Sequence, residues 1–273
     1  MGFILSVTTT PKRLNKLIDI IPHIKTNYKF FVINLCSEYK RFGPFKIPKE
    51  LLQLCKKNKK VVFNFMDDFG PVVKYLGGFE FMKKRNLKYD KLIVIDDDTF
   101  YRPDLFDGLL DEKTKDNITT GSGFNYDKNF NYVIVEGSTT MVEGYAGICF
   151  EYSQKSDFIF WYSKFYKHFD FKNINLSLID KYLSASFLGD DFIISQEYEN
   201  KFAIKNGRKY LSPQPYGFEE DALHKNDSFG SNMGSYKFLS DNKKIYETFK
   251  NKYYLNKEIT KELINENTCL LVK

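Results

Sequence analysis

The chain has 273 residues, which is enough to bury one full α/β core, and it carries a formal net charge of +6. Lysine supplies most of its basic residues, and these are scattered apart from one dense run at 56–60. Lysine is poorer than arginine at bidentate recognition of bases and phosphates. We therefore interpret the charge as a solvated basic surface and expect no nucleic-acid partner.

The cysteines and the apolar runs argue against export and against a membrane span. The four cysteines show no CxxC spacing and no neighbouring histidine, which favours reduced thiols over disulfides or a zinc site. The first apolar run is far too short for a signal peptide, and no later run approaches the ~18 residues of a membrane span. We expect a soluble, cytoplasmic protein.

In the first hundred residues, short apolar runs alternate with helical patterns. Apolar residues recur at helical spacing from Leu14 to Ile21 and end at Pro22, Pro48 suits the first position of a second helix, and Pro71 opens a third. Strands are expected at 3–7, 30–35, 61–65 and 92–95. This alternation predicts a mostly parallel sheet with helices on both faces.

The pattern changes after residue 110. Short strands or loops are expected at 119–123, 132–135 and 145–150, and helices at 156–169 and 190–199. The last 30 residues are polar and predict a peripheral helix and a tail. No fixed repeat and no low-complexity linker divides the chain, so we expect a single domain.

Three adjacent aspartates, Asp96, Asp97 and Asp98, directly follow the strand expected at 92–95. Adjacent carboxylates repel one another unless cations or hydrogen-bond donors compensate them. Alternate residues of an extended strand point the same way, so Asp96 and Asp98 are expected to share a face. Hard oxygen ligands suit Mg²⁺ or Mn²⁺, whereas an acidic loop that caps the next helix is the simpler alternative.

The chain resembles the GT-A-fold glycosyltransferases, most closely the small enzymes encoded by large DNA viruses and some bacteria. Five segments carry this resemblance, and they occur in the same order as in that family. These segments are 6–13, 67–74, 95–98, 143–147 and 189–191, and the likeness spans roughly residues 3 to 225. The resemblance implies transfer of one sugar from a nucleotide-diphosphate sugar, most commonly a UDP-sugar, to a glycan or glycoprotein acceptor. It also implies a divalent metal, Mn²⁺ or Mg²⁺, on the diphosphate, and a location in the host cytoplasm if the protein is viral.

The resemblance also implies how the chain is divided within one GT-A-like, Rossmann-related domain. Residues 1–110 would form the nucleotide-binding half, about 111–235 an acceptor and catalytic half with a smaller mixed sheet, and about 236–273 the periphery. At the end of the first strand, Thr8, Thr9, Thr10 and Arg13 would contact the base, ribose or phosphates. A strand-to-helix turn capped by a threonine is an equal alternative for these residues.

The segment 67–74 is expected to bind the donor. Glycine and proline shape a helix start there, whose N-terminus attracts anions, and Lys74 near the first turn would meet the diphosphate. Asp67 or Asp68 would accept a hydrogen bond from base or ribose, although a simply capped helix also explains an aspartate here. Val73 and the pair Gly77-Gly78 stand where relatives would have more polar or proline-bearing residues.

The resemblance assigns metal binding to the aspartate cluster. Asp98 would coordinate the metal directly, Asp96 would bind ribose or a metal-bound water, and Asp97 would be a further donor-side residue that points elsewhere. His224 is a candidate late ligand that closes the metal site, with a surface histidine as the alternative.

The acceptor side is assigned to two later segments. Gly144 lies in a run of small residues where the backbone would approach a sugar closely. Asp191 is the expected general base of an inverting transfer, with Asp190 as its neighbour, although both would also favour a helix N-terminus electrostatically. The remaining alternatives are a metal-dependent nucleotidyl- or phosphotransferase, and a catalytically degenerate sugar-nucleotide-binding protein.

Overall fold

The computed structural model confirms the alternation of strands and helices in the first hundred residues. It describes residues 2–39, 42–111, 117–126, 132–134, 137–139, 141–157, 159, 190–198, 202–204 and 211–215. The elements of the first part are β1 Phe3–Thr8, α1 Lys16–His23, β2 Phe30–Cys36, α2 Lys49–Lys57, β3 Val61–Met66, the 3-10 turn η1 Gly70–Val72, α3 Val73–Lys84, β4 Lys91–Ile95, β5 Thr99–Tyr101 and α4 Pro103–Leu109.

Helix ends differ from the expected ones by a single residue at two prolines. Pro22 lies inside the last turn of α1, which ends one residue later, where the Ile24 N–H bonds to the Ile21 carbonyl. Pro48 is the N-cap of α2 and not its first residue. Both differences are within the usual fraying of helix ends.

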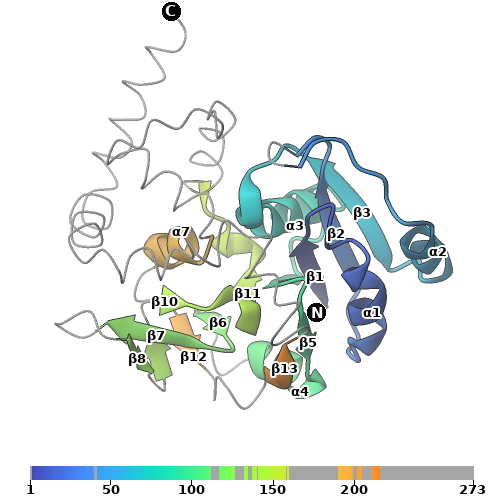
Figure 1. Cartoon of the computed structure of the whole chain (residues 1–273). Helices are drawn as coiled ribbons and strands as arrows, with labels where there is room; N and C mark the ends of the chain where they lie inside the picture. Colours follow the sequence, from blue (N-terminus) through green and yellow to red (C-terminus); the bar gives the residue numbers. More distant parts are fainter. Residues whose placement is uncertain are drawn as a thin grey trace, which may run out of the picture.

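The main sheet is mostly parallel at its core. Within the described residues its eight strands run in the order β3-β2-β1-β4-β11-β6-β12-β9, and the first four are parallel (Figure 1). The later strands are β6 Ile118–Thr120, β9 Gly137–Thr139, β11 Ile148–Glu151 and β12 Phe202–Ile204. β11 pairs antiparallel with both β4 and β6, which joins the later segments to the first half.

The strands of the second half pair in both directions, with β12 parallel to β6 and antiparallel to β9, and a separate smaller sheet there is antiparallel. Its strands are β7 Gly123–Tyr126, β8 Tyr132–Ile134 and β10 Met141–Val142, and β13 Leu211–Pro215 pairs separately with β5. The run 119–123, expected as a short strand or loop, divides between β6 and β7, and the run at 145–150 begins within the 3-10 turn η3 Gly144–Ala146. Short turns interrupt both runs, so the chain can change sheets.

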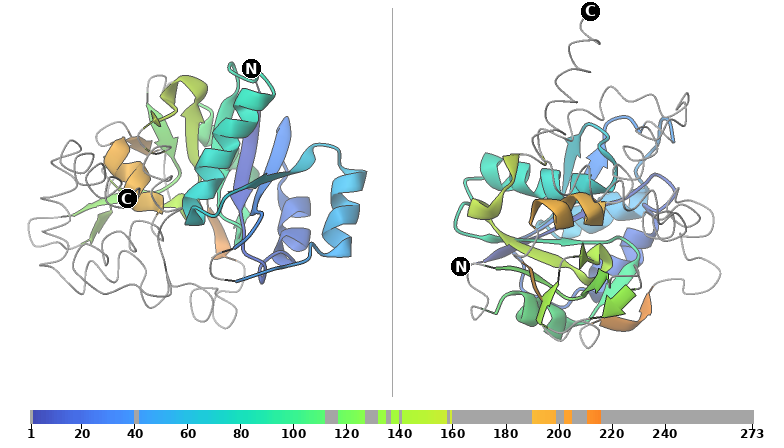
Figure 2. Two further views of the ribbon diagram at one scale, coloured as in Figure 1. Left: turned by 90° about the horizontal axis from the view of Figure 1, so that it is seen from above. Right: turned by 90° about the vertical axis from the view of Figure 1, so that its left-hand side faces the viewer.

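The two faces of the sheet are covered by different helices (Figure 2). One cluster of buried side chains joins α3 and α7 (Asp190–Glu197) to Ile4, Val32 and Leu92, and the other joins α1, α2 and α4 to Leu5, Ile33 and Ile93. Because side chains alternate along a strand, consecutive strand residues serve opposite clusters. None of the described helices is long and apolar enough to span a membrane.

The pair Gly77-Gly78, unexpected from the sequence, lets α3 lie close to the sheet. A Cβ atom on Gly77 would lie 2.0 Å from Asn34 Oδ1, and one on Gly78 would lie 2.5 Å from Leu92 Cδ1. Asn34 is fully buried and donates to Ser6 Oγ at 2.8 Å, and Ser6 Oγ donates to the Lys74 carbonyl at 2.5 Å. This chain of buried hydrogen bonds fixes the first turn of α3, and with it Lys74, against β1 and β2.

Candidate active site

The site lies where the order of the parallel strands reverses. From β1 the chain builds β2 and β3 on one side and then crosses back to place β4 on the other side of β1. The loops that follow β1 and β4 therefore leave the same edge of the sheet side by side. In open α/β sheets, ligands bind at this switch point, outside the carboxyl ends of the strands.

Arg13, from the loop after β1, binds two of the three strand-end aspartates. Its Nη2 atom lies 2.6 Å from Asp97 Oδ1 and 2.7 Å from Asp98 Oδ2. Burial alone would lower the pKa of Arg13, but the charges of Asp97 and Asp98 raise it above its usual value. Burial raises the pKa of Asp97 to about 6, against the opposing effect of Arg13.

The extended backbone from which we expected Asp96 and Asp98 to share one face ends before these residues. The strand ends at Ile95, and the chain turns at residues 97 and 98 before β5 begins. The alternation of an extended strand therefore stops too early. Asp97 and Asp98 converge on Arg13, whereas Asp96 pairs with Lys74. Of the three side chains, Asp96 is the most exposed at 30%, against 5% for Asp97 and 14% for Asp98.

Lys74 is the second cation of the site, and it is almost fully buried. Its Nζ atom binds Asp96 Oδ1 and lies 2.8 Å from Asp190 Oδ2 at the first residue of α7. Burial alone would lower the pKa of Lys74, but Asp190 and Asp96 raise it well above its usual value. With a side chain 3% exposed and two carboxylate partners, Lys74 joins the two acidic segments, a role that the sequence did not predict.

Asp190 and Asp191 open α7 and lie against this lysine. Burial raises the pKa of Asp191 well above its ordinary value, and the neighbouring Asp190 raises it further. Burial also raises the pKa of Asp190, although Lys74 opposes the shift. The pair is therefore an acidic group that holds protons more tightly than free aspartates do.

Gly144 is the point where the backbone comes closest to these charges. A Cβ atom there would lie 2.3 Å from Asp191 Oδ1 and 2.9 Å from Lys74 Nζ. The sequence predicted a close backbone approach to a sugar, and the structure gives a close approach to Asp191 and Lys74. Glycine is required because any side chain at this position would displace the carboxylate or the ammonium group.

Other predicted donor residues hold the backbone of the site. Thr8 Oγ1 donates to the Asn34 carbonyl at 3.2 Å, and the Thr9 carbonyl accepts the Tyr39 hydroxyl at 2.7 Å. Asp68 is buried, and its Oδ1 accepts the Gly70 N–H at 3.0 Å, a local turn bond that spans Phe69, the N-cap of η1. Thr10 lies in the loop that leads to Arg13, between the end of β1 and α1.

Tyr101 is a site residue that the sequence did not reveal. Its buried hydroxyl accepts the backbone N–H of Asp96 at 2.8 Å, which fixes the chain where β4 ends. An aromatic residue three positions after an aspartate cluster carries no signal of this role. The contact arises because β5 folds back beside the end of β4.

A divalent metal fits this site only in part. No group of three or more His, Cys, Asp or Glu side chains among the described residues is arranged to hold a metal, and His224 lies outside those residues. Asp96 and Asp98 nevertheless offer partly exposed hard oxygens. Magnesium-type sites commonly use one or two carboxylates and take further oxygens from substrate phosphates. The residues present therefore fit a metal that arrives with a diphosphate.

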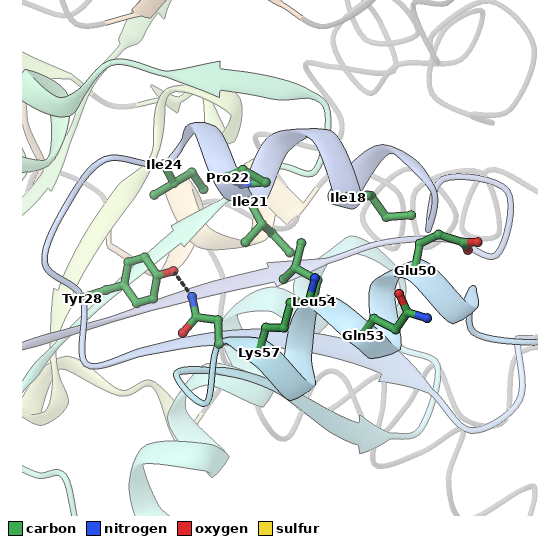
Figure 3. A pocket seen from close by; sticks show the side chains of 10 residues that line it. Ile18, Ile21, Pro22, Ile24, Tyr28, Glu50, Gln53, Leu54 and Lys57 are labelled. Atoms are coloured by element: carbon green, nitrogen blue, oxygen red, sulfur yellow. Dashed lines mark hydrogen bonds between the residues drawn. The ribbon is translucent and has the colours of Figure 1, made fainter.

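A cavity of about 480 Å³ lies elsewhere, between α1 and α2 (Figure 3). Its lining is mostly apolar near Ile21 and Leu54, with Lys57 and Glu50 at the α2 side. It shares no residue with the aspartate site, and it opens between the helices that cover the opposite face of the sheet from α3. This cavity is therefore not a part of the candidate active site.

No family model and no curated protein matches this sequence. Among solved structures, a 4-diphosphocytidyl-2C-methyl-D-erythritol synthase aligns at 8% identity and a TM-score of 0.41, over 78% of this chain and 93% of its own. A Francisella tularensis 2-C-methyl-D-erythritol 4-phosphate cytidylyltransferase aligns at 10% identity and a TM-score of 0.43, over 78% of this chain and 94% of its own. S. aureus TarS 1–349 in complex with UDP aligns at 11% identity and a TM-score of 0.40, over 77% of this chain and 59% of its own. Likenesses this low do not bear on activity.

The buried position of Lys74 predicts a large cost on its removal. Lys74→Met leaves the buried Asp190 and the partly exposed Asp96 without their cation, so we expect the free energy of unfolding to fall by about 3–5 kcal/mol, mainly through Asp190. The control is Lys29→Met, because Lys29 also lies 2.8 Å from an aspartate, Asp90, but its side chain is 49% exposed. That loss should stay below about 1 kcal/mol in urea unfolding. Equal losses of unfolding free energy in the two variants would contradict the buried, bridging role of Lys74.

Gly144→Ala tests the close approach to Asp191. The added methyl group must displace the Asp191 carboxylate, so we expect a loss of stability of about 1–3 kcal/mol together with lost activity. Gly2→Ala is the control, because the three atoms nearest its added Cβ would all belong to the Lys29 side chain and none to a site residue. Thermal unfolding should report a smaller loss for Gly2→Ala, and turnover per folded molecule should fall only for Gly144→Ala.

Proposed function

We propose that this protein is a glycosyltransferase that moves one sugar from a UDP-sugar to a hydroxyl group of a glycan acceptor, with inversion. One observation carries the proposal. Buried Lys74 joins Asp96, at the donor end of the sheet, to Asp190 and Asp191, at the start of a helix from the second half. An acidic donor edge and an acidic pair therefore face one another across a single ammonium group.

The donor would lie at the switch point between β1 and β4. Asp98 and Asp96 would hold a divalent metal together with the donor diphosphate, and that ion would offset the charge that develops on the departing diphosphate. The Arg13 guanidinium is paired with the Asp98 carboxylate. Donor binding therefore requires Arg13 either to share this carboxylate with the metal or to turn toward a phosphate oxygen. Thr8, Thr9 and Thr10, in the same loop, would offer backbone and hydroxyl groups to the nucleoside.

The acceptor would lie on the side of α7. Asp191 would accept the proton of the acceptor hydroxyl as its oxygen attacks the anomeric carbon, and the bond from that carbon to the diphosphate oxygen would break. The acceptor oxygen and the diphosphate occupy opposite faces of the sugar, so the configuration inverts. A raised pKa makes Asp191 a stronger base than an exposed aspartate once it has lost its proton.

The charge of the acceptor side favours a hydroxyl acceptor over a phosphate. A nucleotidyl- or phosphotransferase must bind an anionic acceptor next to an anionic donor. Here Asp190 and Asp191 offer a phosphate no positive charge in either protonation state. The nearby cations Lys74 and Arg13 already bind carboxylates. Like charge would repel a phosphate acceptor, whereas a neutral sugar hydroxyl carries no such cost.

Metal and donor are expected to bind together because neither fills the site alone. UDP with Mn²⁺, at 100 times the dissociation constant, should raise the melting temperature by about 5–10 °C, and Mn²⁺ alone should change it little. Asp98→Asn should abolish the joint effect, whereas Asp107→Asn, an exposed carboxylate on α4, should keep it. An equal shift with Mn²⁺ alone would contradict a shared metal.

The raised pKa of Asp191 predicts that activity rises at a higher pH than a free aspartate base would give. A base must be deprotonated, so kcat should rise with pH as Asp191 loses its proton, at saturating donor and metal. Asp191→Asn should lower kcat by roughly 10²–10⁴ and remove that rise. The assay follows UDP and glycoside together across a panel of UDP-sugars and acceptors. Release of a nucleotidylated product instead would identify the alternative chemistry.

A further inference from the structure

The helix that carries Asp190 and Asp191 is held by two consecutive residues of α3. Lys74 binds Asp190 at the first residue of α7, and Tyr75 contacts Tyr198, the residue that follows its last one. These two contacts lie about 12 Å apart along α7, at 1.5 Å of rise per residue. The helix is therefore fixed at both ends by one turn of α3.

The contact at the far end is a directed chain of hydrogen bonds. The Ser156 N–H donates to the Tyr75 hydroxyl at 2.8 Å, and the two tyrosine hydroxyls lie 2.5 Å apart. The Tyr198 hydroxyl donates to the Gln154 carbonyl, so the Tyr75 hydroxyl must be the donor between the two rings. Each hydroxyl thus accepts one bond and donates one, and neither is left unmatched.

The surroundings make these hydroxyls sensitive to any shift of α7. Tyr75 is fully buried and Tyr198 is 5% exposed, and their rings pack against Phe79, Phe150 and Phe202. Phenylalanine would satisfy this packing just as well. A slip of α7 along its axis would leave buried hydroxyls unpaired, which costs more than the bonds themselves contribute.

A third contact fixes the middle of the helix. Fully buried Ser195 accepts the Val142 N–H on its Oγ at 3.0 Å, and Val142 is two residues before Gly144. Gly144 in turn lies against Asp191. The segment that limits the space around Asp191 is therefore bound to the same helix.

We propose that Tyr75 and Tyr198 are positioning residues, whose hydroxyl pair sets the axial position of α7 and so holds Asp190 and Asp191 in place beside Lys74. Neither tyrosine lies among the charged groups of the site, so both act through the helix. The catalytic consequence rests on the proposed glycosyl transfer, whereas the structural consequence does not.

The experiment compares Tyr75→Phe and Tyr198→Phe with Tyr152→Phe, and each variant keeps its ring. Tyr152 is the control because it packs against Phe79 in the same cluster and is only partly buried. In both test variants, amide exchange over 190–198 should speed up by about fivefold. The kcat should fall by up to about 10²-fold, with UDP affinity unchanged, because misplaced catalytic groups affect turnover and not donor binding. Tyr152→Phe should change none of these.

The outcomes separate this proposal from the proposed function. Unchanged exchange and unchanged kcat in both test variants would overturn the positioning role, and so would faster exchange with an unchanged kcat. If the wild-type protein transfers no sugar, the proposed function fails, and the exchange data still decide whether the hydroxyl pair holds α7. If a test variant does not fold, Ser195→Ala replaces it, because it loosens the same helix from the Val142 side.

Discussion

The ammonium group of Lys74 is the contact on which the rest of the site depends, because it binds carboxylates from two distant parts of the chain. Asp96 belongs to the end of a central strand and Asp190 to a helix more than ninety residues later. A buried lysine is tolerated only when its charge is matched, and here the match also brings the two acidic segments together. The position of Lys74 is itself set by close helix–sheet packing at Gly77 and Gly78 and by the Ser6 hydrogen bond.

The carboxylates of the site outnumber its cations. Five aspartates, Asp96 to Asp98 with Asp190 and Asp191, share two cations, Arg13 and Lys74. Burial and mutual repulsion raise the pKa of Asp97, Asp190 and Asp191, so protons take up part of the excess charge. This excess of carboxylates suits the divalent metal that we propose, because such a cation would offset negative charge that Arg13 and Lys74 leave unmatched.

The ion pairs of Arg13 and those of Lys74 serve different steps of the proposed reaction. Arg13 joins the loops after β1 and β4, which are both on the donor side, whereas Lys74 reaches from the donor side to α7. Changes at Arg13 should therefore affect donor binding, and changes along α7 should affect the acceptor step. The tyrosine pair at the far end of α7 extends this second group into the apolar core, where hydrogen bonds set position better than packing does.

The sequence by itself determined the α/β class, the four parallel strands and the acidic end of β4. Those features depend on local apolar patterns and on short-range order, which a single sequence carries. It also singled out Arg13, Lys74, Gly144, Asp190 and Asp191 as site residues, through a resemblance in segment order. Their catalytic roles remain predictions, and His224 lies outside the described residues.

Only the tertiary structure decided which charges meet. Asp96 pairs with Lys74 and Asp98 with Arg13 because the chain turns at residues 97 and 98, and such a local turn leaves no mark on apolar periodicity. The closeness of Lys74 to Asp190, of Gly144 to Asp191 and of Tyr75 to Tyr198 joins residues about 50 to 120 positions apart. Such contacts follow from how strands are ordered and how helices pack on them, and no local pattern along the chain specifies that arrangement.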